Sequence, residues 1–299
     1  RELIEDQAAR QITDLYRSIS GISFFSYAGV TLRGFRQENV LYDGLRGDPY
    51  AGFSVPQLFN IERVEVLKGP AGALYGGGDA GGVINYVTRK PQAAAERRIE
   101  VQLGDKDFRA GSIEGTGPLN AAGSVRYRAG LYADNEKGVR WNTNSESVIG
   151  DASLAFDVGQ TGELVLQFTD ITQNLGGNRL RGVPVDDNGS FLTDRRWNHN
   201  EATDFLDMRA KVALAQYRFS PSTNLDVDVG ARWFENNEHQ IYHEPMGLID
   251  RNRDGVPEWM TRQLRNQIRD NDAFTANGNA VWRVSTGSIE HKVLFGADV

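Results

Sequence analysis

The feature that most constrains this fold is a regular alternation of apolar and polar residues in the segments that follow residue 97. Leu225, Val227, Val229, Ala231 and Trp233 are apolar, and the residues between them are Asp, Asp, Gly and Arg. The segments 125–131 and 274–284 alternate in the same way. Alternation with a period of two gives a β-strand one apolar and one polar face. The pattern therefore predicts long strands that belong to an antiparallel sheet.

The connections between these strands are informative as well. We expect strands near residues 97–104, 108–116, 124–133, 145–158, 163–173, 204–219, 225–239, 271–286 and 289–299. The second, fourth, sixth and eighth strands are followed by short turns, whereas about 11, 30 and 31 residues follow the third, fifth and seventh. The short connection after the first strand is an exception. Alternating turns and long loops are typical of outer-membrane barrels, whereas a soluble sandwich, the alternative, usually has strands of about five or six residues.

Composition excludes several classes of protein. The 299 residues contain no Cys, which removes disulfide frameworks, thiolate metal sites and cysteine nucleophiles. A net charge of −7 argues against a nucleic-acid surface, so no nucleic-acid partner is expected. No stretch approaches the roughly 18 apolar residues of a membrane helix. That absence does not exclude a membrane barrel, because barrel strands are only about half apolar.

Residues 1–91 have a different pattern and are predicted to form a small α+β domain. Apolar residues at helical spacing predict a helix between Glu5 and Ile19, and short strands are expected at 30–32, 40–42, 63–67 and 83–87. Pro91 and the Ala-rich residues 92–96 read as a linker. The chain starts without Met and stops inside a predicted strand, so we expect it to be part of a longer protein.

The most specific motif runs from Asn60 to Pro91, NIERVEVLKGPAGALYGGGDAGGVINYVTRKP. This segment closely resembles the plug-domain signature of TonB-dependent outer-membrane receptors. Upstream, Leu32-Arg-Gly-Phe35 and Tyr42-Asp-Gly-Leu45 match two further plug motifs in the expected order. Within that family the chain is most similar to ferric-siderophore receptors. The residues that carry the plug motifs are Gly34, Phe35, Gly69, Pro70, Tyr75, Gly76, Gly81, Gly82 and Asn85.

The resemblance implies a plug domain over 1–91, with its N-terminus missing, followed over 97–299 by the first part of an antiparallel transmembrane β-barrel. About eight strands and part of a ninth would be present, out of 22 in the family. The implied function is transport of a ferric siderophore across the outer membrane of a Gram-negative bacterium, without enzymatic activity. The ligand would bind between the plug apex and the extracellular loops. No covalently bound cofactor is expected, and iron enters only as cargo.

The resemblance also implies partners for the whole protein. A periplasmic TonB protein, energised by ExbB and ExbD, would pull an N-terminal segment that we expect before Arg1. Outer-membrane lipid would surround the barrel.

Candidate site residues follow from the same motifs. Arg33 and Lys68 match the family's plug–barrel lock, whose acidic partners are expected beyond residue 299. Many relatives carry Arg at the second position, and Lys lacks the bidentate fork. Charge-assisted hydrogen bonds and stacking would suit an anionic ferric chelate at the plug apex. The candidates there, each of which could instead be a solvated loop residue, are Arg36, Gln37, Arg46, Tyr50 and Phe53.

Four other patterns in the sequence are also compatible with ordinary structure. Gly76–Gly81 fits G-x-G-x-x-G, but the β-branched residues after it predict a strand where a dinucleotide site needs a helix. His239 and His243 on a strand would lie about 13 Å apart, too far for one zinc ion. For Glu65, an ordinary solvated charge on a strand is as good an interpretation as a functional role in the plug motif. Asp250, Asn252 and Asp254 resemble a calcium loop, although Thr261 stands where its last Glu should be.

Three rival functions stay open at this point. The chain could belong to a receptor for haem, cobalamin, a sugar or another metal chelate, or to a signal-transducing siderophore receptor. An outer-membrane esterase would need a Ser/His/Asp cluster, and the sequence contains neither G-x-S-x-G nor H-E-x-x-H.

Overall fold

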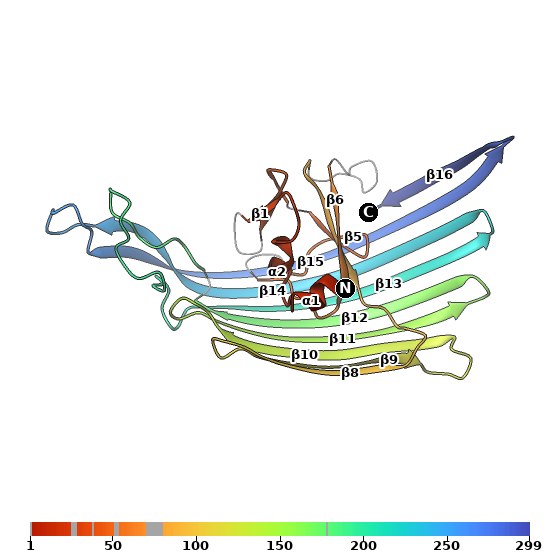
Figure 1. Ribbon diagram of the computed structural model, residues 1–299, viewed down its shortest axis with the longest axis horizontal. Helices are drawn as coiled ribbons and strands as arrows, with labels where there is room; N and C mark the ends of the chain where they lie inside the picture. The colour runs from red at the N-terminus through yellow and green to blue at the C-terminus, as the bar shows by residue number, and fades with distance from the viewer. Residues whose placement is uncertain (1, 25–28, 38, 51–53, 70–79, 178) are drawn as a thin grey trace.

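The computed structural model describes residues 2–24, 29–37, 39–50, 54–69, 80–177 and 179–299. It has two parts: a nine-stranded antiparallel sheet, called the wall here, and a smaller α+β part, the plug, which lies on the inner face of the curved wall (Figure 1). This arrangement agrees with the fold class predicted from the alternation and the plug motifs.

The plug begins with two short helices, α1 (Glu2–Asp6) and α2 (Ile12–Tyr16). The single helix predicted between Glu5 and Ile19 is therefore wrong. Ala8 takes a positive φ of 48°, which ends the first helix. Asp14 then accepts hydrogen bonds from the backbone N–H groups of Arg10 (3.0 Å) and Gln11 (3.1 Å), so a new helix starts after Gln11.

Two small sheets complete the plug. The first has the order β1 (Ile22–Phe24), β2 (Val30–Leu32), β3 (Phe35–Arg36). The second has the order β5 (Leu45–Arg46), β4 (Val40–Tyr42), β7 (Gly82–Thr88), β6 (Ile61–Lys68), with β4 and β7 parallel. The predicted plug strands are confirmed. The helices and both sheets share one buried core of Ile12, Leu15, Tyr16, Val30, Tyr42, Leu58, Ile61, Ile84 and Tyr86.

Each wall strand pairs with its neighbours in the sequence. The strands are β8 (Glu96–Leu103), β9 (Arg109–Pro118), β10 (Val125–Lys137), β11 (Asn144–Val158), β12 (Gly162–Gly176), β13 (Phe205–Ser222), β14 (Leu225–Ile249), β15 (Trp259–Thr286) and β16 (Ile289–Asp298). Short turns lie at one end of the wall, and the longer β12–β13 and β14–β15 connections lie at the other (Figure 1). The β8–β9 and β10–β11 connections at the loop end are short, so the prediction of about 11 residues after the third strand is wrong: residues 138–143 connect β10 to β11.

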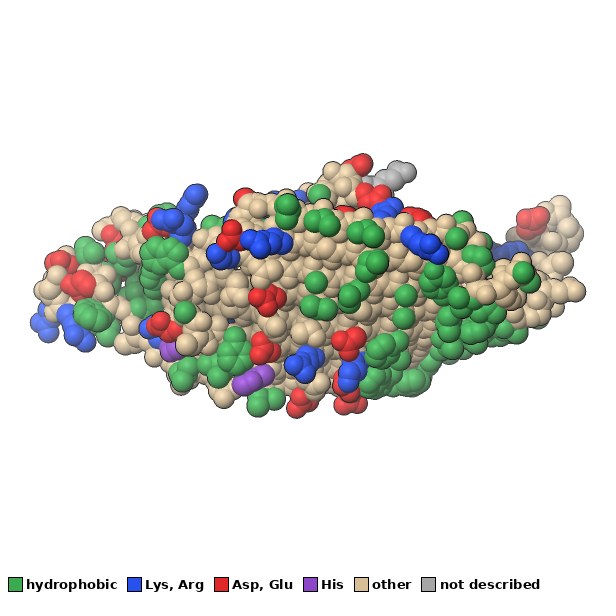
Figure 2. Space-filling model, turned by 90° about the horizontal axis from the view of Figure 1, so that it is seen from below, with side chains coloured by type: hydrophobic (Ala, Val, Ile, Leu, Met, Phe, Trp, Pro, Cys, Tyr) green, Lys and Arg blue, Asp and Glu red, His purple; other side chains and the backbone are tan. Residues whose placement is uncertain are grey.

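The alternation predicted from the sequence sorts the wall side chains by face. Polar residues such as Asp151 and Gln173 point to the plug and are buried, whereas apolar residues such as Ile99 and Phe274 are exposed on the other side. Figure 2 shows hydrophobic side chains gathered on the outer face toward the short-turn end, and charged ones at the β14–β15 tip. Among the described residues, no helix is long and apolar enough to cross a membrane.

The connection of about 31 residues predicted between the seventh and eighth strands is wrong. Strand β14 has 25 residues and β15 has 28, and they stay paired as far as Ile249 and Trp259. Beyond Trp233 and Phe274 most outward positions are polar, with Glu235 opposite Asp272. Ile241, Leu264 and Ile268 are apolar exceptions. A barrel strand crosses the hydrocarbon core in about 9–11 residues. The pair therefore continues well past that length, and its outer face there no longer has a regular apolar alternation.

Candidate functional site on the inner wall

The turn between β4 and β5 positions the candidate ligand loop. Asp43 (φ 54°) and Gly44 (φ 82°) form a tight two-residue turn with both φ angles positive, the type that fits a hairpin. The N–H of Gly44 donates to Oδ1 of Asn85 at 3.0 Å. The plug-motif residue Asn85 therefore holds this turn on strand β7.

Asn85 also contacts Glu65 and stabilises its charged form. Its amide donates to Oε2 of Glu65 at 2.9 Å, and Arg63 donates to Oε1 at 2.8 Å. These contacts, that of Asn85 first, lower the pKa of Glu65. Glu65 is therefore a specific partner within the plug sheet and not only a solvated strand charge.

Residues 44–50, which begin at the second residue of this turn, are called the seat loop because they lie on the wall. Arg232 of β14 reaches it from below and is only 3% exposed. Its Nη1 donates to the carbonyl of Gly47 at 2.9 Å and that of Arg46 at 3.4 Å. The guanidinium also lies 4.8 Å from the ring centre of Tyr42 and 5.2 Å from that of Phe234. A buried cation thus joins the wall, the seat loop and the plug core.

Three more wall amides or hydroxyls hold the backbone of the seat loop. The carbonyl of Pro49 accepts from Asn236 at 2.7 Å, that of Arg46 from Thr275 at 3.3 Å, and that of Gly44 from Asn277 at 3.3 Å. Because all these acceptors are backbone carbonyls, the backbone path of the seat loop depends more on the side chains of the wall than on the side chains of the loop itself.

Gly47 is required where the seat loop passes over the wall. Its φ is 108°, and a Cβ built on it would lie 2.5 Å from Cε1 of Phe234. A larger residue would push the loop away from both Phe234 and Arg232.

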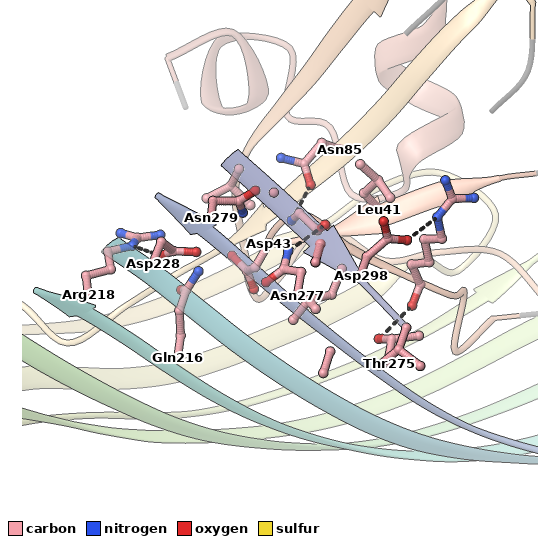
Figure 3. Close-up of a pocket in the computed structure, with 18 of the residues that line it drawn as sticks. Leu41, Asp43, Asn85, Gln216, Arg218, Asp228, Thr275, Asn277, Asn279 and Asp298 are labelled. Atoms are coloured by element: carbon pink, nitrogen blue, oxygen red, sulfur yellow. Dashed lines mark hydrogen bonds and ion pairs between the residues drawn. The ribbon is translucent and has the colours of Figure 1, made fainter. Parts of the chain in front are cut away.

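A cleft of about 740 Å³ lies between the plug and strands β13–β16. In Figure 3, Asp43 and Asn85 face it from the plug, while Gln216, Asp228 and Asn277 face it from the wall. Arg46 lines the same cleft and forms a 3.8 Å ion pair with Asp298 of β16. The lining is rich in amides and in charges of both signs, which makes it a hydrated surface.

The five predicted ligand residues have different surroundings. Arg36 is exposed at the end of β3, and Gln37 beside it is buried and donates to the carbonyl of Asn39 at 2.7 Å. Arg46 faces the cleft. Phe53 lies outside the described residues. These roles stay predictions.

Tyr50, the fifth, is 5% exposed and packs in a cluster with the loop half of the wall. Its N–H donates to Oδ1 of Asp48 at 2.9 Å, and the Tyr42 hydroxyl donates to the same oxygen at 3.4 Å. Burial raises the pKa of Asp48. In this conformation Tyr50 acts as an anchor of the seat loop, and contact with a ligand would need the ring to leave the cluster.

The predicted lock residues lie near each other in the plug. Arg33 is in the β2–β3 turn with φ 56°, and its guanidinium lies beside Gly69. Lys68 immediately precedes Gly69 and donates to Oγ of Ser20 at 2.7 Å. Neither cation forms an ion pair with a described carboxylate, and their role as a lock stays a prediction. Of the other motif residues, Pro70, Tyr75 and Gly76 lie outside the described residues.

The β12–β13 loop and the loop end of the wall contribute residues that the sequence did not single out. The Arg179 guanidinium lies 4.5 Å from the ring centre of Tyr242, and its Nη1 donates to Gln240 at 3.4 Å. Arg269 of β15 pairs with Glu238 at 3.4 Å. Glu238, Gln240 and Tyr242 occupy the inward positions that follow Asn236 along β14. The sequence could have indicated these three residues, because they stand at alternate positions of one amphipathic strand.

The predicted calcium loop forms the tip of the β14–β15 hairpin. One oxygen each from Asp250, Asp254 and Glu258 lies within 4.8 Å of the others. The side chain of Asn252 instead donates to Asp254 at 2.9 Å. Calcium binding there stays a prediction.

The two strand histidines have separate partners. His239 contacts Asn266 at 2.9 Å, and His243 contacts the buried carboxylate of Asp204 at 2.9 Å.

Acidification is expected to loosen the loop that connects β12 and β13. His199 in this loop is 2% exposed. Burial first, and then the charge of Arg181, lower its pKa from 6.5 to about 4. The opened loop, with an ordinary histidine pKa, binds the proton more readily, so stability is complete above pH 6.5 and falls as the pH drops toward 4.

Amide hydrogen exchange across residues 179–204, measured at pH 7.5 and pH 5 and corrected for intrinsic rates, checks this expectation. His199→Gln should remove the dependence on pH, whereas exposed His291, changed to Gln, should leave it intact. Equal protection at both pH values in the unaltered protein would contradict it.

Residues 1–83 match the family model described as the TonB-dependent Receptor Plug Domain. The metal-pseudopaline receptor CntO of Pseudomonas aeruginosa is 32% identical over 248 residues, which are 82% of this chain and 34% of that protein. The catecholate siderophore receptor Fiu of Escherichia coli K12 is 25% identical over 324 residues, 99% of this chain and 42% of that protein. The chain thus spans less than half the length of these relatives.

Solved structures show the same fold. The ferric-catecholate import receptor Fiu of E. coli K12 superposes with a TM-score of 0.89 at 23% identity, over 100% of this chain and 47% of that one. The ferripyoverdine receptor of P. aeruginosa superposes with a TM-score of 0.89 at 20% identity, over 100% of this chain and 41% of that one. These relatives are outer-membrane receptors of Gram-negative bacteria and not enzymes, and this chain is located in the same membrane. The inner wall and the plug seated on it, together with these matches, show that the chain belongs to the TonB-dependent outer-membrane receptors.

Proposed function

We propose that the receptor takes up a ferric siderophore across the outer membrane, with iron as cargo and TonB, energised by ExbB and ExbD, as the driving partner. The ligand binds above the seat loop, between the plug apex and the loop end of the wall. TonB pulls the plug from its N-terminal side, and Arg33 and Lys68 are the cations whose contacts change as the plug is remodelled.

The observation that carries this proposal is the arrangement at the loop end of the inner wall. Along β14, Asn236 is the last inward residue that bonds the seat loop. The inward positions after it lead to Tyr242, and the Arg179 guanidinium lies over the ring of Tyr242. Arg269 and exposed Arg36 add positive charge. Hydroxamate and catecholate chelates of iron offer anionic oxygens and flat rings, which arginine and tyrosine bind by charge-assisted hydrogen bonds and stacking.

A second candidate is a receptor for a chelate of another metal. It is favoured by the 32% identity to a protein named as a metal-pseudopaline receptor. Both candidates use the same site chemistry, because the protein would recognise the organic chelator and its charge.

Growth rescue separates them. We expect the gene at its natural length to restore growth of an iron-starved strain that lacks its own receptors when defined ferric catecholates or hydroxamates are supplied. The control is the same strain without TonB, in which rescue should vanish. Failure with every ferric chelate, together with uptake of a zinc or nickel chelate, haem or cobalamin, would reject the siderophore assignment.

A further inference from the structure

The last residues of the plug, Thr88–Lys90, are called the exit segment because the chain passes through them to the wall. Nη1 of Arg89 donates to both carboxylate oxygens of Glu114 on β9, at 2.8 and 2.7 Å. Nη2 of Arg128 on β10 donates to Glu114 at 2.9 Å, and Nη1 of Arg128 donates to Asp151 on β11. The side chains of Arg128 and Asp151 are 4% and 0% exposed. The exit segment thus joins a buried chain of alternating charges.

The same chain of contacts returns to the exit segment through β12. The second oxygen of Asp151 accepts from Gln167 at 2.9 Å. Oε1 of Gln167 in turn accepts from Nζ of Lys90 at 2.9 Å and lies 2.8 Å from the hydroxyl oxygen of Thr88. The contacts therefore close a ring that spans four neighbouring wall strands, β9 to β12.

One branch of the ring leads to the seat loop. Nζ of Lys90 donates to Oδ2 of Asp43 at 3.1 Å, and the backbone N–H and hydroxyl of Thr88 donate to the same carboxylate at 3.0 and 2.7 Å. Burial lowers the pKa of Lys90, and Asp43 opposes that shift. The turn from which the seat loop starts is therefore fixed to the exit segment.

A network of this kind determines position more than it adds net stability. A buried ion pair is often no better than apolar packing of the same size, but removal of one partner leaves an uncompensated charge and is strongly unfavourable. A buried network with many hydrogen bonds also tolerates few geometries. The exit segment can consequently occupy one place on the wall and leaves it only if several charges lose their partners together.

We propose that Arg89 and Lys90, with Glu114, Asp151 and Asp43, form a second plug lock, distinct from the Arg33 and Lys68 pair. It keeps the last plug strand and the base of the seat loop on β9–β12 while the remainder of the plug is remodelled. Arg89 and Lys90 are positioning residues in this role. The inference rests on the proposed transport function, but it is tested without any ligand.

The test uses the receptor at its natural length in cells. In the double variant Arg89→Met, Lys90→Met we expect the inhibitory concentration of vancomycin, which an intact outer membrane excludes, to fall about tenfold, because broken buried pairs displace the plug. The charge-preserving variant Arg89→Lys, Lys90→Arg should restore most of the resistance. Arg98→Met is the matched control: it removes an exposed plug–wall pair with Glu5, 37% and 47% exposed, and should change nothing.

Barrel assembly is followed in the same cells by the heat-dependent shift of the receptor on gels. Unchanged vancomycin resistance in an assembled double variant would overturn the inference. If the double variant does not assemble, Lys90→Met alone is purified and amide exchange at Thr88, whose N–H bonds Asp43, is measured: faster exchange supports the lock and unchanged exchange rejects it. A receptor that shows the lock but no siderophore uptake would refute the proposed function and leave the lock intact.

Discussion

Replacement of Gly82 by alanine is expected to separate β7 from the rest of the plug while the wall still assembles. A Cβ at this position would lie 2.1 Å from the carbonyl oxygen of Leu67 and 2.7 Å from Cδ2 of Leu32, and φ is 142°. The carbonyl belongs to the paired strand β6, so it cannot move without loss of the β6–β7 ladder. Overpacking together with this backbone strain should destabilise the plug by about 3 kcal/mol or more.

Limited trypsin digestion of the receptor in outer-membrane vesicles measures the effect, because a detached plug is cleaved whereas the wall resists. Gly150→Ala is the matched control, since no described atom lies within 4 Å of its Cβ position and its φ is ordinary. A plug that resists trypsin equally in both variants would show that the Leu67 carbonyl yields more easily than the pairing indicates.

Arg232→Met is the second large effect we expect, on the seat loop. The carbonyl of Gly47 would lose its donor, whereas that of Arg46 would keep the hydroxyl of Thr275. A buried acceptor left unsatisfied costs about 1–3 kcal/mol. The loop should then leave the wall, and affinity for the ferric chelate should fall about 10- to 100-fold. Arg232→Lys should rescue only in part, because one ammonium cannot donate like a guanidinium and stack on two rings.

Two measurements check this expectation. Titration of the ferric chelate gives the dissociation constant, and amide exchange across residues 44–50 reports the loop without any ligand. Arg218→Met provides the control, because Arg218 lines the same side of the wall but is 61% exposed in its pair with Asp228. Unchanged exchange in Arg232→Met would mean that Asn236, Thr275 and Asn277 hold the loop by themselves.

Much of this architecture could be predicted because it depends on local pattern. Alternation identifies a wall strand and its two faces, and the turn at Asp43 and Gly44 is encoded by the two residues themselves. The same reasoning failed where the regular apolar face ends, as in the outer halves of β14 and β15. There the buried inward positions include polar residues such as Glu238 and Gln240, and the outward side has only scattered apolar residues, so no hydrophobic period can be detected.

The wall side chains that hold the seat loop could not be predicted from local patterns. Alternation places Arg232 on the inner face, but its contact with Gly47 depends on the register of β14 against a plug 185 residues away. The ring through Arg89, Glu114 and Asp151 likewise needs four strands in register before its charges meet. Sequence motifs identified Asn85 as important, and only the structure gave the reason, its hydrogen bonds to Gly44 and Glu65.

The neighbour-to-neighbour order of the wall has a consequence for how the chain reaches this state. Every wall strand pairs with the strand before or after it, and most hairpins close a short connection at little entropic expense. The exception is β12–β13, which closes over residues 177–204, and the entropic cost of closure grows only slowly with loop length. The plug contacts are the opposite: Asn277 meets Gly44 across 233 residues of sequence. Although the plug comes first in the chain, its seat is completed late, after β14 and β15 have joined the sheet. A receptor interrupted before that stage would present a partly built wall with an unseated plug.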